Sequence, residues 1–385
     1  MKILLTCHYN FDTNAGAAGV TWRLGQEYEK LGHQVYYYSL DDLPNKLQRL
    51  TKFATFPEFV TYKIESLCKQ QRLDIVDAST GDSWLWGLLQ TNRENRPLLV
   101  ARCHGLEHIE HQEYLQEAER GNLKFSWKYG LYRGSIRLWE VANSMRYSDL
   151  VLLLNSGDAK YIIENLKVKP ERVAIVPNGI ADRFLNLPFE SISTTDNSVI
   201  RIAQIGTYIP RKGIHYSVPA LNKILARYPQ VEVTFCGTKC FECPDPAQVY
   251  ADFAPGVRDR VKVIPYYTNE TLPELLKGHQ IKLFPTISEG FGVALIEAMA
   301  CGLAPITTAT PGPLEIVRDG YDAIVIPPRN SQAIEEALEL LITNRSFLAQ
   351  LRRNAYATAQ SYSWAKIAQK NLSLYEQACL GKCDR

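Results

Sequence analysis

The stretch SEGFGVALIEAMACG, residues 288–302, places a glycine-rich turn between a strand-like run, Ile281–Pro285, and a helical segment. Backbone amides at the start of a helix attract anions, because they lack partners inside the helix and lie at the positive end of its dipole. Here those amides belong to Phe291, Gly292 and Val293, and the glycines leave room for a diphosphate to come close. The sequence therefore predicts a phosphate-binding turn.

Two carboxylates, Glu289 and Glu297, lie on either side of this turn. Carboxylates repel phosphate, so we expect both to bind neutral hydroxyls, Glu289 those of a sugar and Glu297 those of a ribose. The alternative is a tight turn followed by a helix whose acids are simply solvated. A dinucleotide-binding Gly-x-Gly-x-x-Gly fingerprint is excluded, because its third glycine would fall on Leu295.

Apolar runs alternate with amphipathic stretches along the whole chain, which predicts parallel strands joined by crossover helices and hence an α/β fold. The expected strands are Ile3–His8, Val35–Ser39, Ile75–Ser79, Leu98–Cys103, Leu150–Leu154, Val173–Pro177, Ile202–Ile205, Val231–Cys236, Val261–Pro265, Ile281–Pro285, Pro305–Thr308 and Ala323–Ile326, with helices at Gly19–Leu31 and Phe59–Gln71.

A polar stretch without periodicity, residues 191–198, indicates a linker. We therefore expect two doubly wound, Rossmann-like domains, residues 1–190 and 191–362, and a helical tail, 363–385, that packs back on the first domain. Ligands of such sheets bind at the carboxyl ends of the strands, so we expect a shared site in a cleft between the domains.

The 385 residues are 46% hydrophobic and 22% charged, and 43 basic against 41 acidic residues leave a net charge of +2. This balance argues against a nucleic-acid partner, which requires excess positive charge. The apolar start of the chain is too short for a signal-peptide core, and no apolar run is long enough to span a bilayer. The nine cysteines fit reduced thiols better than a disulfide framework, so we expect a cytoplasmic protein.

A second motif, GTYIPRKG at residues 206–213, follows the first expected strand of the second domain. Its adjacent cations, Arg211 and Lys212, are suited to clamp a diphosphate and to stabilise the charge that develops as it leaves. A solvated basic loop is the alternative interpretation.

The first domain offers a turn of small residues and a histidine. The turn NAGAAG, residues 14–19, permits a ligand to approach near Gly16, although a packing turn explains it nearly as well. His104 follows the expected strand Leu98–Cys103, where an imidazole at the cleft edge can hydrogen-bond a reacting sugar or acceptor.

Metal sites are weaker alternatives. His104, His108 and His111 have the spacing of ligands on one helical face, and Cys236, Cys240 and Cys243 have a spacing that can hold an iron–sulfur cluster. No Asp-x-Asp pair is present to hold Mg²⁺ or Mn²⁺ against a diphosphate, so we expect no metal.

Residues 120–147 carry six bases against one acid, interleaved with aromatic side chains. Such a segment can lie on an anionic membrane surface or bind an anionic acceptor. The alternative is that it pairs with the acidic segment before it, residues 107–119, which has five acids and no Lys or Arg.

Taken together, these residues resemble the GT-B glycosyltransferases, and within them the large retaining group called family 4, or glycosyl transferases group 1. The resemblance depends on the paired glutamates, Glu289 and Glu297, within EGFG…EAMACG, and on the Arg-Lys-Gly loop that ends at Gly213. Weaker similarities are VPNGI at residues 176–180 and the His-Gly pair that begins at His104.

The resemblance implies two Rossmann-like domains, with a nucleotide-diphosphate sugar held mostly by the second and an acceptor received by the first. It implies that Lys212 and Arg211 bind the diphosphate, Glu289 the sugar and Glu297 the ribose. Gly16 would lie on the phosphate side of the cleft and His104 beside the anomeric carbon. One departure is Thr207, where the family often has an arginine.

The leading hypothesis is a metal-independent, retaining glycosyltransferase that needs no cofactor beyond its nucleotide-sugar co-substrate. Its acceptor would be a glycan, a glycolipid or another precursor of a cell-surface polysaccharide, with peripheral contact at the inner membrane face through residues 120–147. The alternatives are a nucleotide-sugar epimerase or hydrolase on the same fold, and a non-catalytic protein that binds sugar nucleotides.

Overall fold

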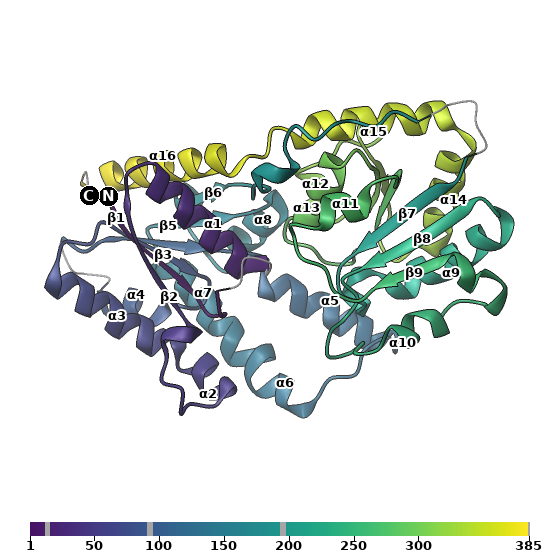
Figure 1. Ribbon diagram of the computed structural model, residues 1–385. Helices are drawn as coiled ribbons and strands as arrows, with labels where there is room; N and C mark the ends of the chain where they lie inside the picture. Colours follow the sequence, from purple (N-terminus) through teal and green to yellow (C-terminus); the bar gives the residue numbers. More distant parts are fainter. Residues whose placement is uncertain (12–15, 91–94, 193–197, 384–385) are drawn as a thin grey trace. The chain divides into compact units, whose positions relative to one another are not determined.

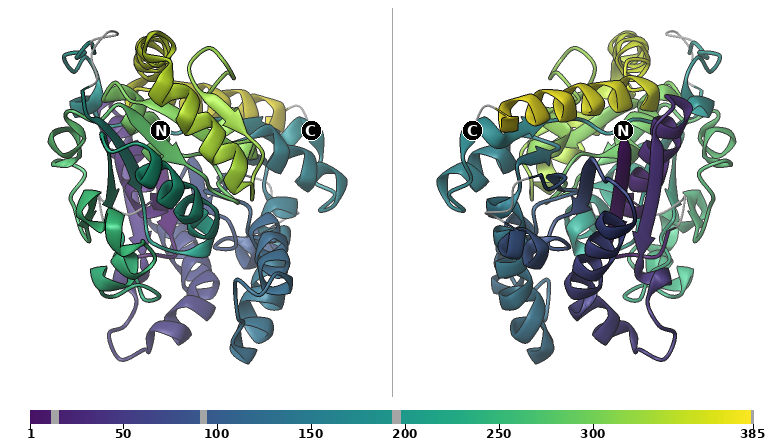
Figure 2. Two further views of the ribbon diagram at one scale, coloured as in Figure 1. Left: turned by 90° about the vertical axis from the view of Figure 1, so that its right-hand side faces the viewer. Right: turned by 90° about the vertical axis from the view of Figure 1, so that its left-hand side faces the viewer.

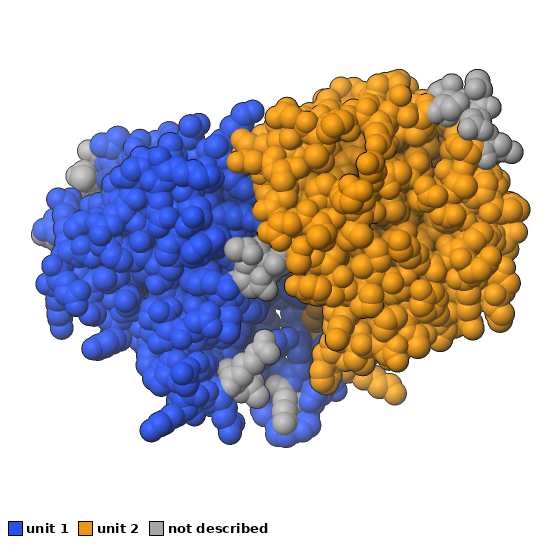
Figure 3. Space-filling view, in the orientation of Figure 1, with its two compact units in different colours: residues 1–111, 125–178, 364–385 blue, residues 112–124, 179–363 orange. Residues whose placement is uncertain are grey.

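The computed structural model describes residues 1–11, 16–90, 95–192 and 198–383. The chain separates into two compact units, shown in different colours in Figure 3. Unit 1 comprises residues 1–111, 125–178 and 364–385, and unit 2 comprises residues 112–124 and 179–363. Each unit is built around one parallel sheet with helices packed on both faces (Figure 1).

The sheet of unit 1 has six strands in the order β2-β1-β3-β4-β5-β6, and every neighbouring pair is parallel. The strands are β1 (Lys2–Cys7), β2 (Gln34–Ser39), β3 (Ile75–Ser79), β4 (Leu98–Arg102), β5 (Leu150–Leu153) and β6 (Val173–Ile175). The helices are α1 (Gly16–Lys30), α2 (Arg49–Ala54), α3 (Phe56–Gln70), α4 (Trp84–Gln90), α5 (Glu107–Glu119, which continues into unit 2), α6 (Trp127–Leu131), the π-helical segment η2 (Tyr132–Ile136), α7 (Arg137–Tyr147), α8 (Ser156–Glu164) and α16 (Trp364–Cys383).

Successive strand residues in unit 1 point to opposite faces, and apolar side chains cover both. On one face the sheet packs against α1 and α16. On the other it packs against α3, α4, α7 and α8. The last helix of the chain thus belongs to the core of unit 1, where the hydroxyl of Tyr375 lies 3.1 Å from that of Tyr28 and accepts a hydrogen bond from Arg102.

The sheet of unit 2 has the order β12-β11-β10-β7-β8-β9 and is also parallel throughout (Figure 2). Its strands are β7 (Ile200–Ile205), β8 (Val231–Cys236), β9 (Val261–Ile264), β10 (Ile281–Phe284), β11 (Ala304–Thr308) and β12 (Ile324–Ile326). The helices are α9 (Ile214–Arg227), α10 (Pro246–Ala251), α11 (Leu272–Leu276), α12 (Val293–Ala300), α13 (Pro311–Leu314), α14 (Ser331–Thr343) and α15 (Arg345–Ala359). Helices α9 and α14 pack on one face of this sheet.

The predicted α/β class and all twelve predicted strands are confirmed, with ends that shift by one or two residues. The observed division of the chain falls at residues 178/179 rather than at 190/191, because residues after 178 bind α15 of unit 2 and the turn that follows it. Ile180 donates to the carbonyl of Tyr362, and Tyr356 donates to the carbonyl of Leu187. Part of the predicted linker, residues 193–197, lies outside the described residues.

Among the described residues, no helix combines the length and the apolar character needed to cross a membrane. Eight cysteines in the described part of the chain are free thiols.

Residues 112–124 belong to unit 2 because an arginine holds them there. Arg329 donates to Glu117 at 2.7 Å and pairs with Glu113, while Asn122 donates to the second oxygen of Glu117 at 2.9 Å. Burial pushes the pKa of Glu117 up, but the hydrogen bonds from Arg329 and Asn122 outweigh burial and hold it below its usual value. The charged form of Glu117 therefore stabilises the folded unit.

We predict that Glu117→Gln lowers the free energy of unfolding at neutral pH by about 1–3 kcal/mol, because the half-buried donors of Arg329 and Asn122 lose a buried, ionised acceptor. Because the folded-state pKa of Glu117 is depressed, this stabilisation is present above the unfolded-state pKa and disappears as the pH falls through the folded-state pKa. The difference between variant and wild type, measured by denaturant titration, should therefore shrink below about pH 4. The exposed Glu336→Gln is the control, and an equal loss in both variants would contradict the assignment.

Candidate functional site

Two loops of unit 2 meet at the carboxyl edge of its sheet, because β7 and β10 are parallel neighbours. The loop after β7 contains the short helix η5, Pro210–Lys212, and the loop after β10 leads into α12. The carbonyl of Arg211 joins them by accepting hydrogen bonds from the amide of Ile287 at 3.0 Å and the hydroxyl of Thr286 at 3.1 Å. The two motifs that the sequence singles out are thus parts of one site.

Two glycines allow the backbone segments of this site to pack closely. Gly213 has a φ of +73°, and a Cβ there would lie 1.9 Å from the carbonyl oxygen of Pro285. Gly312, in α13, faces the second loop, where a Cβ would lie 2.4 Å from the carbonyl oxygen of Glu289. The sequence analysis found the first glycine through its motif but not Gly312, which belongs to no motif considered there.

An ion pair lies at the centre of the site. Lys212 Nζ donates to Glu289 Oε2 at 2.6 Å, and Arg211 Nη1 lies 3.9 Å from the same oxygen while donating to the carbonyl of Ser288. Burial raises the pKa of Glu289, but the charges of Lys212 and Arg211 outweigh burial and hold it below its usual value. The residues expected to bind diphosphate and sugar separately are therefore in contact with each other.

Helix α12 begins where the sequence places it. Gly292 is its N-cap, with a φ of 110°, and offers no side chain to cap the first amides. The ring of Phe291 is buried and lies 6.1 Å from the ring of Tyr362, so this residue can serve a ligand only through its backbone. Val293 is the first helical residue. The amides of this turn can therefore receive an anion.

Glu297 lies in the second turn of α12 and is 4% exposed. Asn269 donates to Glu297 Oε1 at 2.7 Å, which the sequence analysis did not anticipate because Asn269 lies in a loop without a motif. A carboxylate held in this way is placed to accept a hydroxyl hydrogen bond.

Unit 1 supplies His104 directly after β4. Both ring nitrogens are buried and meet no hydrogen-bonding partner among the described residues. Burial, with smaller effects of the Arg102 and His8 charges, lowers the pKa of His104 to about 3. The imidazole is therefore neutral at ordinary pH, and its unused nitrogens are suited to a ligand's hydroxyl.

Gly16 is the first residue of α1, and a Cβ there would meet no atom of the described residues within 4 Å. The preceding residues of the predicted turn, Asn14 and Ala15, lie outside the described part of the chain. The structure thus places open space at Gly16 without showing the turn itself.

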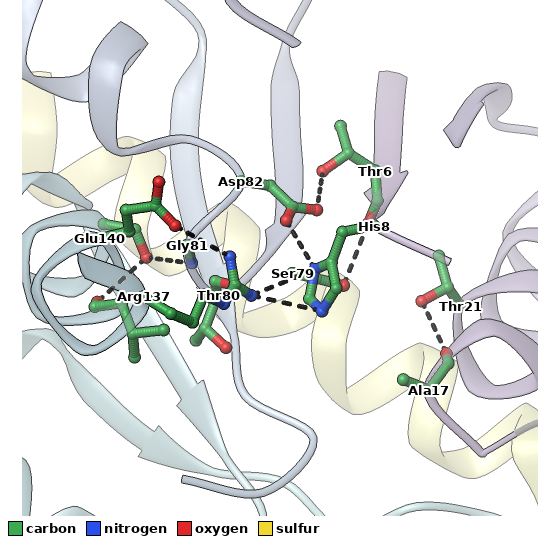
Figure 4. A network of polar contacts seen from close by, with 12 residues as sticks. Thr6, His8, Ala17, Thr21, Ser79, Thr80, Gly81, Asp82, Arg137 and Glu140 are labelled. Atoms are coloured by element: carbon green, nitrogen blue, oxygen red, sulfur yellow. Dashed lines mark hydrogen bonds and ion pairs between the residues drawn. The ribbon is translucent and has the colours of Figure 1, made fainter. Parts of the chain in front are cut away.

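A buried polar network occupies the carboxyl edge of the unit 1 sheet (Figure 4). His8 Nδ1 lies 2.7 Å from Asp82 Oδ1, and Thr6 donates to the other oxygen of Asp82 at 3.1 Å. Arg137 donates to the carbonyl of Thr80 at 2.6 Å. Sequence reasoning missed this network. His8 ends the expected strand Ile3–His8 and Asp82 lies three residues after the expected strand Ile75–Ser79, and polar residues at these strand ends are the signal that could have found it.

One expectation, about the basic segment 120–147, is corrected. Arg137, counted among the bases of segment 120–147, is buried and pairs with Glu107 and Glu140, so it is unavailable to a membrane or an acceptor. Of the three histidines considered as metal ligands, His111 lies 3.0 Å from the hydroxyl of Tyr129. In the described ranges no three His, Cys, Asp or Glu side chains gather to hold a metal ion, the cysteine cluster included.

Family models match both parts of the chain. The model "Glycosyl transferases group 1" matches residues 190–358, and "Glycosyltransferase Family 4" matches residues 15–184. The MMP alpha-(1->4)-mannosyltransferase of Mycolicibacterium hassiacum is 26% identical over 98% of each chain. An uncharacterized glycosyltransferase of Methanocaldococcus jannaschii is 26% identical over 54% of this chain and 55% of the relative. The match thus spans about half the length of that relative.

Solved structures share the fold at low identity. Sucrose-phosphate synthase from Thermosynechococcus elongatus superposes with a TM-score of 0.78 over 99% of each chain at 18% identity. Anabaena HepE in complex with UDP superposes with a TM-score of 0.72 over 98% of this chain and all of the other, also at 18% identity. The two family matches and the two parallel sheets agree, and the chain belongs to the group 1 glycosyltransferases with the GT-B fold.

Proposed function

We propose that this chain transfers a sugar from a nucleotide-diphosphate sugar to an acceptor, with retention of configuration at the anomeric carbon. The observation that carries the proposal is the Lys212–Glu289 ion pair, 2.6 Å long, beside the uncapped start of α12. A cation, helix amides and a carboxylate at one point suit a ligand that joins an anion to a hydroxyl-rich group.

Unit 2 holds the donor in this proposal. Lys212, Arg211 and the amides of Phe291, Gly292 and Val293 bind the diphosphate, and Glu289 accepts hydrogen bonds from the sugar. Glu297, oriented by Asn269, binds the ribose hydroxyls. The Anabaena HepE structure holds UDP on the same fold, which supports a nucleotide donor here.

Unit 1 receives the acceptor, with Gly16 and the neutral His104 on the reacting side. The acceptor oxygen forms its bond to the anomeric carbon as the bond from that carbon to the leaving phosphate oxygen breaks. The leaving oxygen takes the acceptor's proton, and Lys212 and Arg211 stabilise its charge, so the reaction uses no metal ion.

The acceptor that we propose is a glycan or a lipid-linked precursor of a cell-surface polysaccharide. The mannosyltransferase relative supports a sugar acceptor, and the structural neighbour WaaG is a glycosyltransferase involved in lipopolysaccharide biosynthesis. Epimerase and hydrolase activities are the alternatives, and both would release product without an acceptor sugar.

Exposed apolar side chains on α6, η2 and α7 favour an acceptor at a membrane surface. Trp127 is 74% exposed, Leu131 60%, and Ile136 and Trp139 52% each. The exposed Arg133 lies in the same segment. Exposed rings and a cation are suited to an anionic bilayer surface, and we propose peripheral contact with the inner membrane face there.

We predict that Lys212→Ala and Glu289→Ala each reduce kcat by on the order of 100-fold or more, because each removes a charge directed at the donor or its departing diphosphate. Turnover is measured as nucleotide release from a panel of sugar nucleotides, with and without acceptor glycans.

The matched controls are Lys223→Ala and Glu335→Ala, which break an ion pair between α9 and α14 away from these loops. Near-normal kcat in both site variants would contradict the donor site. Nucleotide release without an acceptor would favour a hydrolase.

We also predict that wild-type turnover persists in excess EDTA. Inhibition by EDTA that a divalent cation reverses would contradict the metal-free reaction.

For the membrane contact, we predict that the triple change Trp127→Ser, Trp139→Ser and Arg133→Gln weakens binding to anionic vesicles by on the order of 100-fold, because it removes two interfacial rings and one charge. Co-sedimentation with phosphatidylglycerol vesicles measures this affinity. Phe241→Ser in unit 2, which changes a ring that is 97% exposed, is the control. Wild-type protein that stays in the supernatant would refute the contact.

A further inference from the structure

One lysine within the sheet of unit 2 is used by neither the fold nor the donor site described above. Lys282 is the second residue of β10, a strand with neighbours on both sides, and it is 0% exposed. Its Nζ meets no hydrogen-bonding partner among the described residues. A buried lysine without a partner is costly to the folded chain, so its presence calls for a role in binding.

The position of Lys282 places its charge beside the donor loops. Along β10, Ile281 and Leu283 point into the apolar core shared with α9 and α14. Lys282 and Phe284 therefore point to the opposite face of the sheet. Lys282 Nζ lies 5.3 Å from the centroid of the Phe284 ring, and Lys212 Nζ lies 5.5 Å from the same centroid. Both ammonium groups thus lie against one ring.

That ring also contacts the start of α12. A Cβ built on Gly292 would lie 3.3 Å from Phe284 Cε1, so the ring forms the floor beneath the predicted phosphate-binding turn. A positive charge on Lys282 therefore acts on this turn across the buried Phe284 ring, where a low local dielectric screens it little.

The cations of the basic loop are already partly neutralised, so the site can use a further positive charge. Glu289 contacts Lys212 and lies 3.9 Å from Arg211, so the basic loop is partly neutralised before any donor arrives. A nucleoside diphosphate brings at least two further negative charges. Lys282 is a positive group close to the turn whose ammonium is not already bonded to a described residue.

We propose that Lys282 is a buried cation of the donor site, which takes up a proton when a nucleoside diphosphate binds at the turn before α12. The inference rests on the proposed function, because it assumes that the turn binds the diphosphate of a donor. Lys282 acts on the ligand through its field rather than by contact, so it is a positioning residue.

The groups that face Lys282 support a proton that is gained and lost near neutral pH. Burial lowers the pKa of Lys282 to about 7. The positive charge of Lys212 contributes to this lowering, while Cys236 of β8, Glu297 of α12 and Glu289 oppose it. An added diphosphate would also raise this pKa, so the ligand-free lysine is largely neutral at about pH 8 and the liganded one is charged.

The experiment is isothermal titration of the full chain with UDP, GDP and ADP. Proton uptake is measured at about pH 8 in buffers of different ionisation enthalpy, and affinity is measured at about pH 7 and about pH 8. We expect the wild type to take up roughly half a proton or more with the nucleotide that binds. Lys282→Met should abolish this uptake and weaken binding by about tenfold at about pH 7. Lys282→Arg, which is always charged, should retain binding but show no uptake.

Stability separates this role from a purely structural one. Lys282→Met removes an unpartnered buried amine, so its Tm should equal or exceed that of the wild type while binding falls. A lower Tm with unchanged affinity and proton uptake would show that the lysine only packs, and would overturn the proposal. If Lys282→Met fails to fold, Lys282→Gln is tested in its place by the same measurements, Tm and nucleotide binding with its proton uptake. The exposed Lys262→Met, in β9 of the same sheet, is the control and should change neither.

The outcomes distinguish this inference from the proposed function. Wild-type protein that binds none of the three nucleotides contradicts the donor site itself and the inference with it. Wild-type protein that binds one of them with the same proton uptake as Lys282→Met leaves the donor site standing and overturns the role of Lys282 alone.

Discussion

The Lys212–Glu289 ion pair depends on a backbone constraint, the contact of Gly213 with the carbonyl of Pro285. The loops after β7 and β10 approach so closely there that any Cβ would lie 1.9 Å from the carbonyl oxygen. Their closeness lets the backbone carbonyl of Arg211 accept two hydrogen bonds from the second loop. It also brings Lys212 Nζ to 2.6 Å from Glu289 Oε2. Without this contact the two halves of the candidate site would be separate surface loops.

In unit 1, the buried guanidinium of Arg137 balances the negative charge of several carboxylates. The carboxyl edge of its sheet gathers Asp82, Glu107 and Glu140, and burial raises the pKa of Glu107 and raises that of Glu140 to about 7. Arg137 offsets this by pairing with both glutamates while donating to the carbonyl of Thr80. Its guanidinium occupies the space where a Cβ on Gly81 would lie, 2.2 Å from Nη1. The network is therefore packed too tightly to be a solvated patch. The ring nitrogens of His104, which follows β4 of the same sheet, have no hydrogen-bonding partner among the described residues.

Much of this arrangement can be predicted from the sequence, because periodicity and glycine placement are local properties. All twelve strands and the start of α12 follow from apolar runs and from one turn. The contact of Lys212 with Glu289 does not follow, because it joins residues 77 positions apart and depends on which strands are neighbours. The attachment of residues 112–124 to unit 2 depends in the same way on Arg329, in a loop without a motif. Lys282 lies inside the expected strand Ile281–Pro285, but only the structure shows that its ammonium lies against Phe284.

The ion pair also bears on how a donor would enter and a product would leave. A nucleoside diphosphate alone competes with Glu289 for Lys212 and gives the carboxylate nothing in return. A complete sugar nucleotide supplies hydroxyls to Glu289 as its phosphates take Lys212, so both buried charges keep partners. After transfer the sugar departs with the acceptor, and Glu289 regains Lys212 at the expense of the remaining diphosphate. On the proposed function, the same 2.6 Å contact therefore favours binding of the donor over retention of the spent nucleotide.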